Sequence, residues 1–468
     1  MYYSKIIKGL SWNFLGTILS QLFIFLAFVF IARKLGVESF GKFSLIYISG
    51  LTLSGLFSLA IGQYMVTYIS KNNKDTHIIS IFLSNILFYT YSIVLFLIII
   101  LSLNSEYIIG DILNLENIKL NLFYIIMIFI FELFFLLQKS FLISIEEFKI
   151  LSIFSISKGF LFLSFVWVFS NGMNIYIGVL ISLLLTTIFG FIIIYKKINN
   201  INITIKYINS KILKEIINFT VPSFLSSLMV TPVNWILMSL LSSTNNGLIQ
   251  VALFNAVLRI QNSIVLIGQV VGNIILPILS KNEKSEININ QLNILVPLAI
   301  GISFSLLLIF FNEIFLLIFG SKYEIKYYKE VFSLQMVTTI FILYKQGFAR
   351  VLIVKNKMWF TLFSNFLWLT IVIFGAKYLI IDYGVLGISI AIIIAYIINI
   401  FFFLPYYVKL DLIPLKYIYS FKIILLWLFV LLFSYAGYIL SIKFRLIIII
   451  LTLCIIYLIL RKKYEKKV

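Results

Sequence analysis

Long apolar stretches follow one another along almost the whole chain, and this feature constrains the fold most strongly. Most of them are 20–28 residues long, and a helix of about 20 residues crosses the roughly 30 Å of hydrocarbon in a bilayer. With 62% hydrophobic and 12% charged residues, the chain is too apolar for a soluble domain. We therefore predict an all-α polytopic membrane protein with about fourteen transmembrane helices, at residues 10–32, 43–68, 78–102, 120–143, 150–170, 174–195, 217–241, 248–276, 293–318, 331–353, 358–380, 384–407, 420–440 and 444–461.

The connectors between these stretches are short and carry most of the charge. When the N-terminus is placed in the cytoplasm, most of the 37 Lys and Arg residues fall on the cytoplasmic side, as the positive-inside rule requires. We therefore predict that both termini are cytoplasmic and that the basic C-terminal tail lies near anionic headgroups. The net charge of +20 then belongs to the membrane boundary, and no nucleic-acid partner is expected.

Residue counts and motifs exclude several kinds of chemistry. One cysteine, Cys454, and one histidine, His77, cannot form a disulfide or a Cys/His zinc cluster. The segment Gly36–Lys42 has the spacing of a phosphate-binding loop, but Phe43 stands where a hydroxyl must contact magnesium. The connectors are also too short for the large external loop of membrane polysaccharide polymerases. We expect no cofactor, no metal and no enzymatic activity.

A weak internal repeat relates the first six stretches to the next six. Gly41 matches Gly247, and Gln138–Phe141 matches Lys345–Phe348, at an offset of about 206 residues. Because six is an even number of crossings, the two halves would be related by a pseudo-two-fold axis along the membrane normal, with the substrate site between them. We predict an N-terminal six-helix lobe at 1–197, a cytoplasmic linker at 198–216, a C-terminal six-helix lobe at 217–409, and two further helices with a basic tail at 410–468.

Arg259 lies deep within one of the apolar stretches. It is roughly 18 Å from the turn at Asn245–Gly247, at the rise of a helix. A charge at this depth costs on the order of 2.5–3.5 kcal/mol, so its side chain should face a protein interior or a wet cavity and meet an anionic partner. A cavity for an anionic substrate satisfies this requirement, and so does a buried glutamate that only holds helices in register.

Other charged residues lie at membrane depth or near it. The cations are Lys158, Lys139 and Lys345. They and Arg259 outnumber the two acids at membrane depth, Glu132 and Glu313, which favours an anionic substrate. Lys139 and Lys345 lie toward the cytoplasmic ends of their stretches, so they either bind substrate or extend to the headgroups. Glu132 either pairs with a basic residue or binds a coupling ion, and Glu313 is expected to reach the membrane interface.

Amide side chains continue the polar character of the stretch beyond Arg259. Asn262 and Gln269 are seven residues apart and share a helical face with Arg259. Amides in this arrangement can bind sugar hydroxyls, and they can equally form hydrogen bonds between helices.

The opening of the chain resembles a known family. Lys5 and Lys8, Trp12-Asn13, Ala32-Arg33-Lys34-Leu35-Gly36 and Phe40-Gly41-Lys42-Phe43-Ser44 are similar to the start of Wzx-type polysaccharide flippases in the MOP exporter superfamily. This resemblance implies two six-helix lobes in a V around a cationic cavity. It also implies alternating access that carries an undecaprenyl-diphosphate-linked oligosaccharide, an O-antigen or capsule repeat unit, from the inner to the outer leaflet. The implied location is the bacterial cytoplasmic (inner) membrane, with membrane lipids and a polysaccharide polymerase or other assembly proteins as partners.

On this hypothesis the substrate is bound by basic and amide side chains, namely Arg259, Lys158, Lys345, Lys139, Asn262 and Gln269. The alternative is a MATE-like ion-coupled multidrug or cation antiporter of the same superfamily, in which Glu132 binds the coupling ion. The excess of interior bases favours the flippase. Related lipid II flippases carry arginines in their first two spans, and the second span here, 43–68, has none.

Overall fold

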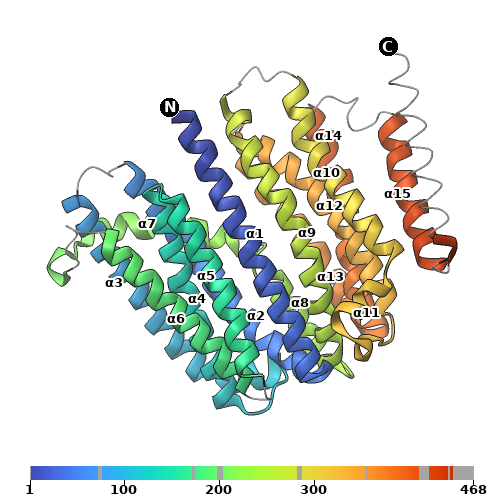
Figure 1. Cartoon of the computed structure of the whole chain (residues 1–468), viewed down its shortest axis with the longest axis horizontal. Coiled ribbons are helices and arrows are strands. Elements are labelled where there is room, and N and C mark those ends of the chain that lie inside the picture. Colours follow the sequence, from blue (N-terminus) through green and yellow to red (C-terminus); the bar gives the residue numbers. More distant parts are fainter. Residues whose placement is uncertain are drawn as a thin grey trace. The chain divides into compact units, whose positions relative to one another are not determined.

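The computed structural model describes residues 2–71, 76–170, 174–197, 204–281, 287–354, 357–409, 421–440 and 443–445. All regular secondary structure in these residues is helical (Figure 1), which confirms the predicted all-α membrane fold. Ten helices in the described part of the chain are long and apolar enough to cross a membrane.

Most predicted spans coincide with one helix each. The first six are α1 (Tyr2–Leu35), α2 (Val37–Lys71), α3 (Thr76–Leu103), α4 (Ile118–Ser144), α5 (Phe148–Val168) and α6 (Asn174–Lys197). Later spans correspond to α9 (Gly247–Lys281), α12 (Tyr328–Val354), α13 (Met358–Tyr383), α14 (Val385–Lys409) and α15 (Phe421–Ile439). The predicted span at 444–461 lies outside the described residues, apart from 444 and 445.

Two predicted spans are broken into shorter helices. The seventh consists of α7 (Ser210–Ser227) and α8 (Val233–Ser242), with Pro232 at the N-cap of α8. Proline has no backbone N–H and its ring clashes with the preceding turn, so it begins a helix more readily than it continues one. The ninth consists of α10 (Ile287–Phe310) and α11 (Glu313–Phe319). Short elements in the connectors are the π-helix η1 (Glu106–Ile112) and the 3₁₀ helices η2 (Ile205–Tyr207) and η3 (Ser321–Tyr323).

The chain forms two compact units. Unit 1 consists of Met1–Arg259 and Leu362–Ala391, and unit 2 of Ile260–Thr361 and Ile392–Val468. Helix α9 therefore contributes its first third, up to Arg259, to unit 1 and the remainder, from Ile260, to unit 2. The predicted division into lobes at 1–197 and 217–409 stays a prediction.

Close helix contacts in unit 1 hold the elements that carry its buried charges. Helix α2 packs against α4, and α1 packs against α5. A Cβ added at Gly50 would lie 2.6 Å from the side chain of Ile128, and one at Gly159 would lie 2.5 Å from the carbonyl oxygen of Ser20. Small residues are typical at helix contacts in membranes, where association depends on close van der Waals packing.

In unit 2, α10 packs against α12 and α15. The rings of Phe310 and Phe433 stack with centroids 4.1 Å apart. Arg445, just beyond α15, forms an ion pair with Glu313 at 3.0 Å and donates a hydrogen bond to the carbonyl of Phe310 at 2.8 Å. Arg445 is thereby attached to the break between α10 and α11, and Glu313 has a structural partner.

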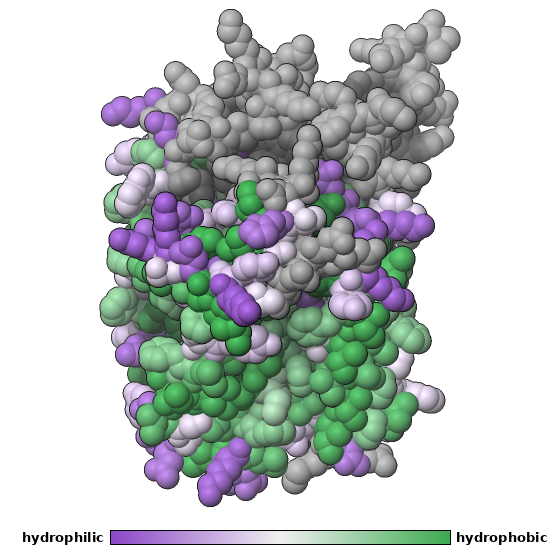
Figure 2. All heavy atoms as spheres, turned by 90° about the vertical axis from the view of Figure 1, so that its left-hand side faces the viewer, coloured by the Kyte–Doolittle hydropathy of each residue, from purple (hydrophilic) through white to green (hydrophobic). Residues whose placement is uncertain are grey.

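The surface over α3 and α6 is apolar. Leu95 and Phe96 on α3, and Ile188 and Phe191 on α6, are exposed. Figure 2 shows a band of apolar side chains on this side, with hydrophilic side chains along its lower and upper edges. Monomeric soluble proteins rarely expose so large a continuous apolar surface, which is the surface that lipid tails require.

Candidate functional site

Arg259 lies against an aromatic cluster in unit 1. Its guanidinium carbon is 3.5 Å from the ring centroid of Phe28 on α1 and 5.9 Å from that of Tyr47 on α2. Both rings are buried, and Phe28 also stacks on Phe162 of α5, with centroids 5.9 Å apart. A guanidinium over an aromatic face gains about 0.5–2 kcal/mol, more where water is excluded. The aromatic faces therefore help to keep this charge within the protein interior.

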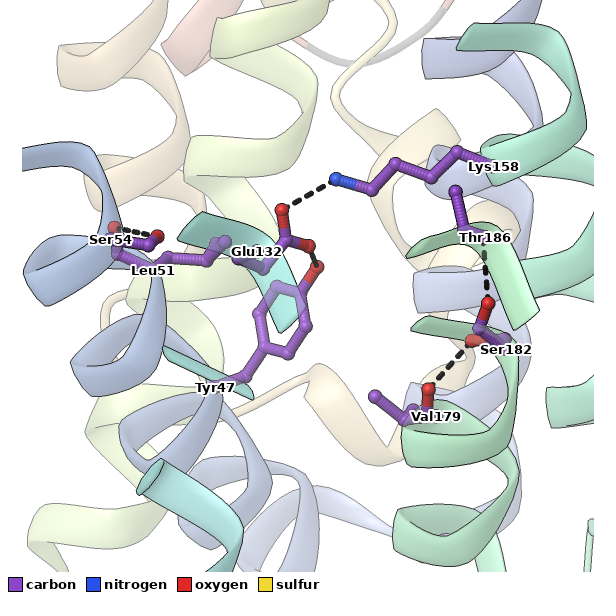
Figure 3. Close-up of polar contacts among 8 residues, drawn as sticks. All are labelled: Tyr47, Leu51, Ser54, Glu132, Lys158, Val179, Ser182 and Thr186. Carbon is purple, nitrogen blue, oxygen red and sulfur yellow. Dashed lines mark hydrogen bonds and ion pairs between the residues drawn. The ribbon is translucent and has the colours of Figure 1, made fainter. Parts of the chain in front are cut away.

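Lys158 is held by a carboxylate. Its ammonium nitrogen lies 2.6 Å from Oε2 of Glu132 (Figure 3), and the two side chains are 10% and 2% exposed. The same ammonium lies 4.0 Å from the ring centroid of Phe135, one turn along α4 from Glu132. Of the two roles predicted for Glu132, pairing with a base is the one seen in this conformation.

Tyr47 connects the two charged groups. Its hydroxyl donates a hydrogen bond to Oε1 of Glu132 at 3.5 Å (Figure 3), while its ring faces Arg259. Lys158, Glu132, Tyr47 and Arg259 thus form one network contributed by α5, α4, α2 and α9. The network contains two cations and one carboxylate, so its formal charge is positive.

Lys139 adds further positive charge near this network. It lies on α4 two turns after Glu132, on the same face of that helix. An anion bound beside these residues would pair with the excess of cations.

The remaining predicted binding residues lie elsewhere. Lys345 is in unit 2, on α12, with its ammonium 5.9 Å from the ring centroid of Tyr396 on α14. Asn262 and Gln269 are exposed on α9. The buried amide between them and Arg259 is Gln261, which donates a hydrogen bond to the backbone carbonyl of Gln335 on α12 at 2.9 Å. Gln261 therefore joins two helices of unit 2.

Sequence reasoning missed the aromatic partners of the charges. Phe40, Phe43 and Tyr47 are spaced by three and four residues and therefore share one face of α2. That pattern indicates a buried helix face, but it does not indicate that Arg259, more than 200 residues later in the chain, packs against it. Within the described residues, no group of three or more His, Cys, Asp or Glu side chains is arranged to hold a metal.

Solved structures with a similar fold are membrane transporters. The lipid II flippase MurJ in an inward closed conformation has a TM-score of 0.71 at 17% identity, covering 92% of this chain and 98% of that chain. A multidrug resistance MATE family transporter in an inward-facing conformation has a TM-score of 0.61 at 14% identity, covering 81% and 92%. A MOP superfamily transporter from Pyrococcus furiosus has a TM-score of 0.60 at 15% identity, covering 84% and 92%. The fold is that of the MOP superfamily of transporters.

The sequence places the chain within a narrower group. The profile of the family described as "Polysaccharide biosynthesis protein" matches residues 6–283, more than half of the chain, and the chain belongs to this family. The polysaccharide-biosynthesis family and the transporter fold, both predicted from the resemblance of the opening residues, are thereby confirmed. A search of curated protein sequences finds no match.

Proposed function

We propose that the protein is a flippase that moves a polyprenyl-diphosphate-linked oligosaccharide from the inner to the outer leaflet of the bacterial cytoplasmic membrane by alternating access. Both termini would be cytoplasmic, and the partners would be the undecaprenyl-diphosphate-linked glycan, membrane lipids and a polysaccharide polymerase or other assembly proteins. Family membership and the fold support the broad class. The observation that supports the particular substrate is the positively charged network of Arg259, Lys158, Glu132 and Tyr47 within unit 1.

Arg259 is suited to a diphosphate by its geometry. Stacking on Phe28 uses the face of the guanidinium, whereas phosphate oxygens accept hydrogen bonds from N–H groups in its plane. The two interactions are therefore compatible, and the ring would orient the arginine for a bidentate contact. Lys158 would contribute by pairing with a phosphate oxygen in place of the carboxylate of Glu132, which would keep its hydrogen bond from Tyr47.

The other predicted residues would act before and after this contact. We assign Lys139 and Lys345 to the cytoplasmic approach of the diphosphate, and Asn262 and Gln269 to hydrogen bonds with sugar hydroxyls. Lys139 lies on the same face of α4 as Glu132. The exposure of Asn262 and Gln269 leaves them accessible to a ligand.

Export of surface polysaccharide in cells lacking the native gene tests this proposal. Expression of the wild-type chain should restore export, Arg259→Glu should abolish it, and Arg259→Lys should restore it only in part, because lysine lacks the planar fork. Lys377→Glu makes the same charge reversal at an exposed position of α13 and should restore export fully. Membrane levels of each variant are measured alongside. Wild-type export with Arg259→Glu would remove the assigned role.

An ion-coupled multidrug or cation antiporter is the second candidate, because MATE transporters share the fold. Glu132 would then bind the coupling ion or a cationic drug. Its ion pair with Lys158 and the positive charge of the network favour the flippase. Drug resistance conferred on a sensitive host, and lost with Glu132→Gln, would instead support the antiporter.

A further inference from the structure

A separate cavity of about 240 Å³ opens at one end of unit 1. It lies where α1 turns into α2 at Gly36 and where α4 begins, at the end of α1 opposite the N-terminus (Figure 1). None of the charged residues of the Arg259 network lines it. Under the predicted topology this end of unit 1 faces the outside of the cell.

Two tyrosine rings form one wall of the cavity. Tyr124 on α4 and Tyr176 on α6 stack with centroids 4.7 Å apart and planes at 22°. Phe43 on α2 meets Tyr176 edge-on at 5.5 Å and supports it from the protein interior. Stacked, supported rings offer a rigid apolar surface with polar hydroxyls at its edge. The C–H face of a pyranose ring is complementary to such a surface.

Polar side chains surround the tyrosine wall. Lys42, Glu116, Asn117 and Asn121 line the cavity. Asn117 has φ +55° at the N-cap of α4, and its side chain makes no capping hydrogen bond to the helix. Carboxylate, ammonium and amide groups together supply the donors and acceptors that hydroxyl groups require.

The charges of the lining favour a neutral ligand. Lys42 and Glu116 carry opposite charges, and Lys42 also forms an ion pair with Glu38 at 3.5 Å. A phosphate would find one cation, already paired, beside a carboxylate. The cavity of about 240 Å³ has room for one sugar ring.

We propose that this cavity binds one neutral pyranose residue of the glycan on the outer side of the membrane. This assignment rests on the proposed function for the identity of the glycan and on the predicted topology for its side. A sugar held here would pack its apolar face on Tyr124 and Tyr176 and would be oriented by Asn117 and Asn121. Such a subsite would retain the oligosaccharide head on the outer side and oppose its return.

Saturation-transfer difference NMR on the purified full chain in nanodiscs tests the site directly. The probes are the methyl glycosides of glucose, galactose, N-acetylglucosamine and N-acetylgalactosamine. Transfer to the C–H protons of at least one glycoside is expected, with affinity at least tenfold weaker in Tyr176→Ala and within twofold of wild type in Tyr176→Phe, which keeps the ring. Glycerophosphoethanolamine is the probe for a lipid headgroup.

A second variant separates binding from folding. Asn117→Gly removes the side chain and places glycine at a positive φ that it adopts readily, so the backbone is not strained. It should weaken glycoside binding severalfold at unchanged thermal stability. The site is overturned if no glycoside shows transfer, if Tyr176→Ala and Asn117→Gly bind as wild type does, or if glycerophosphoethanolamine binds in place of the sugars.

Export assays distinguish failure of this site from failure of the flippase. If Arg259→Glu abolishes export while Tyr176→Ala leaves both export and glycoside binding unchanged, the flippase stands and the sugar site is wrong. If the wild-type chain does not restore export but glycosides bind and the variants weaken them, the sugar site stands and the flippase is wrong.

Discussion

The ion pair between Lys158 and Glu132 can be broken one partner at a time. The separation of 2.6 Å gives an attraction of roughly 6 kcal/mol by Coulomb's law at an effective dielectric constant of about 20. Desolvation of the two groups offsets much of this attraction. Loss of Glu132 alone leaves the ammonium of Lys158 buried without its carboxylate, and such losses cost about 3–5 kcal/mol.

We therefore expect Glu132→Gln to lower the free energy of unfolding by about 3–5 kcal/mol, and the double variant Glu132→Gln/Lys158→Met to recover at least about 2 kcal/mol of this loss. Unfolding in mixed detergent micelles, followed by far-UV circular dichroism, measures the stability of the wild type, of Glu132→Gln and of the double variant. The double variant should fold but export poorly, because one proposed phosphate ligand is gone.

The chain contains a matched control for this experiment. Lys197 and Glu147 also lie 2.6 Å apart, but their side chains are 39% and 35% exposed. Water screens such a pair, so Glu147→Gln should cost at most about 1 kcal/mol. If Glu132→Gln and Glu147→Gln have equal effects, or if the double variant is no more stable than Glu132→Gln, burial does not determine the strength of the pair and the reasoning is wrong.

Three further changes test the packing described above. Phe28→Ala should lower the free energy of unfolding by about 3–5 kcal/mol and reduce export. Phe28→Tyr keeps a ring against Arg259 and should retain most of the export. Equal export by the two variants would exclude a role for the ring. Gly41→Ala should lower the free energy of unfolding by about 1–3 kcal/mol in thermal unfolding, because its Cβ would lie 2.0 Å from the carbonyl oxygen of Leu248. Gly110→Ala is the control: its Cβ would meet only one atom, at 3.9 Å, and its stability should be within about 0.5 kcal/mol of wild type. Arg445→Lys should lower the free energy of thermal unfolding by about 1–3 kcal/mol, because lysine cannot replace the N–H donors to Glu313 and to the carbonyls of Phe310 and Leu440. Wild-type stability of this variant would show that the guanidinium group is dispensable.

The helices of this fold were predictable to within a few residues at many of their ends. The expected span at 174–195 is the helix Asn174–Lys197, and the expected span at 384–407 is Val385–Lys409. The first helix is longer than its span, Tyr2–Leu35 against 10–32, because a helix continues beyond the hydrocarbon while hydropathy marks only its apolar part. Pro222 and Pro232 predict a break in the seventh span, and the structure has one at Pro232. The break within the ninth span, between α10 and α11, was not predicted, since a short interruption leaves the average hydropathy high.

The candidate site was predictable only in part. Depth in an apolar stretch was enough to select Arg259 and Lys158, because hydrocarbon penalises any charge in the same way wherever it occurs. The amide side chains after Arg259 were a weaker indication, because the same residue type takes both roles: Gln261 joins two helices, whereas Asn262 and Gln269 are exposed and stay candidate ligands. The tyrosine pair that lines the cavity beside α4 and α6 had no sequence signal, because Tyr124 and Tyr176 belong to different helices.

The amino-acid sequence by itself determined that the chain is a helical membrane protein and that its interior carries more basic than acidic groups. These are properties of local composition, set by the transfer of each segment from water to lipid. Only the tertiary structure decided which groups meet. Glu132 pairs with Lys158 from 26 residues away and with Tyr47 from 85 residues away, because helix packing, and not position along the chain, brings side chains within the few ångströms over which ion pairs and hydrogen bonds act.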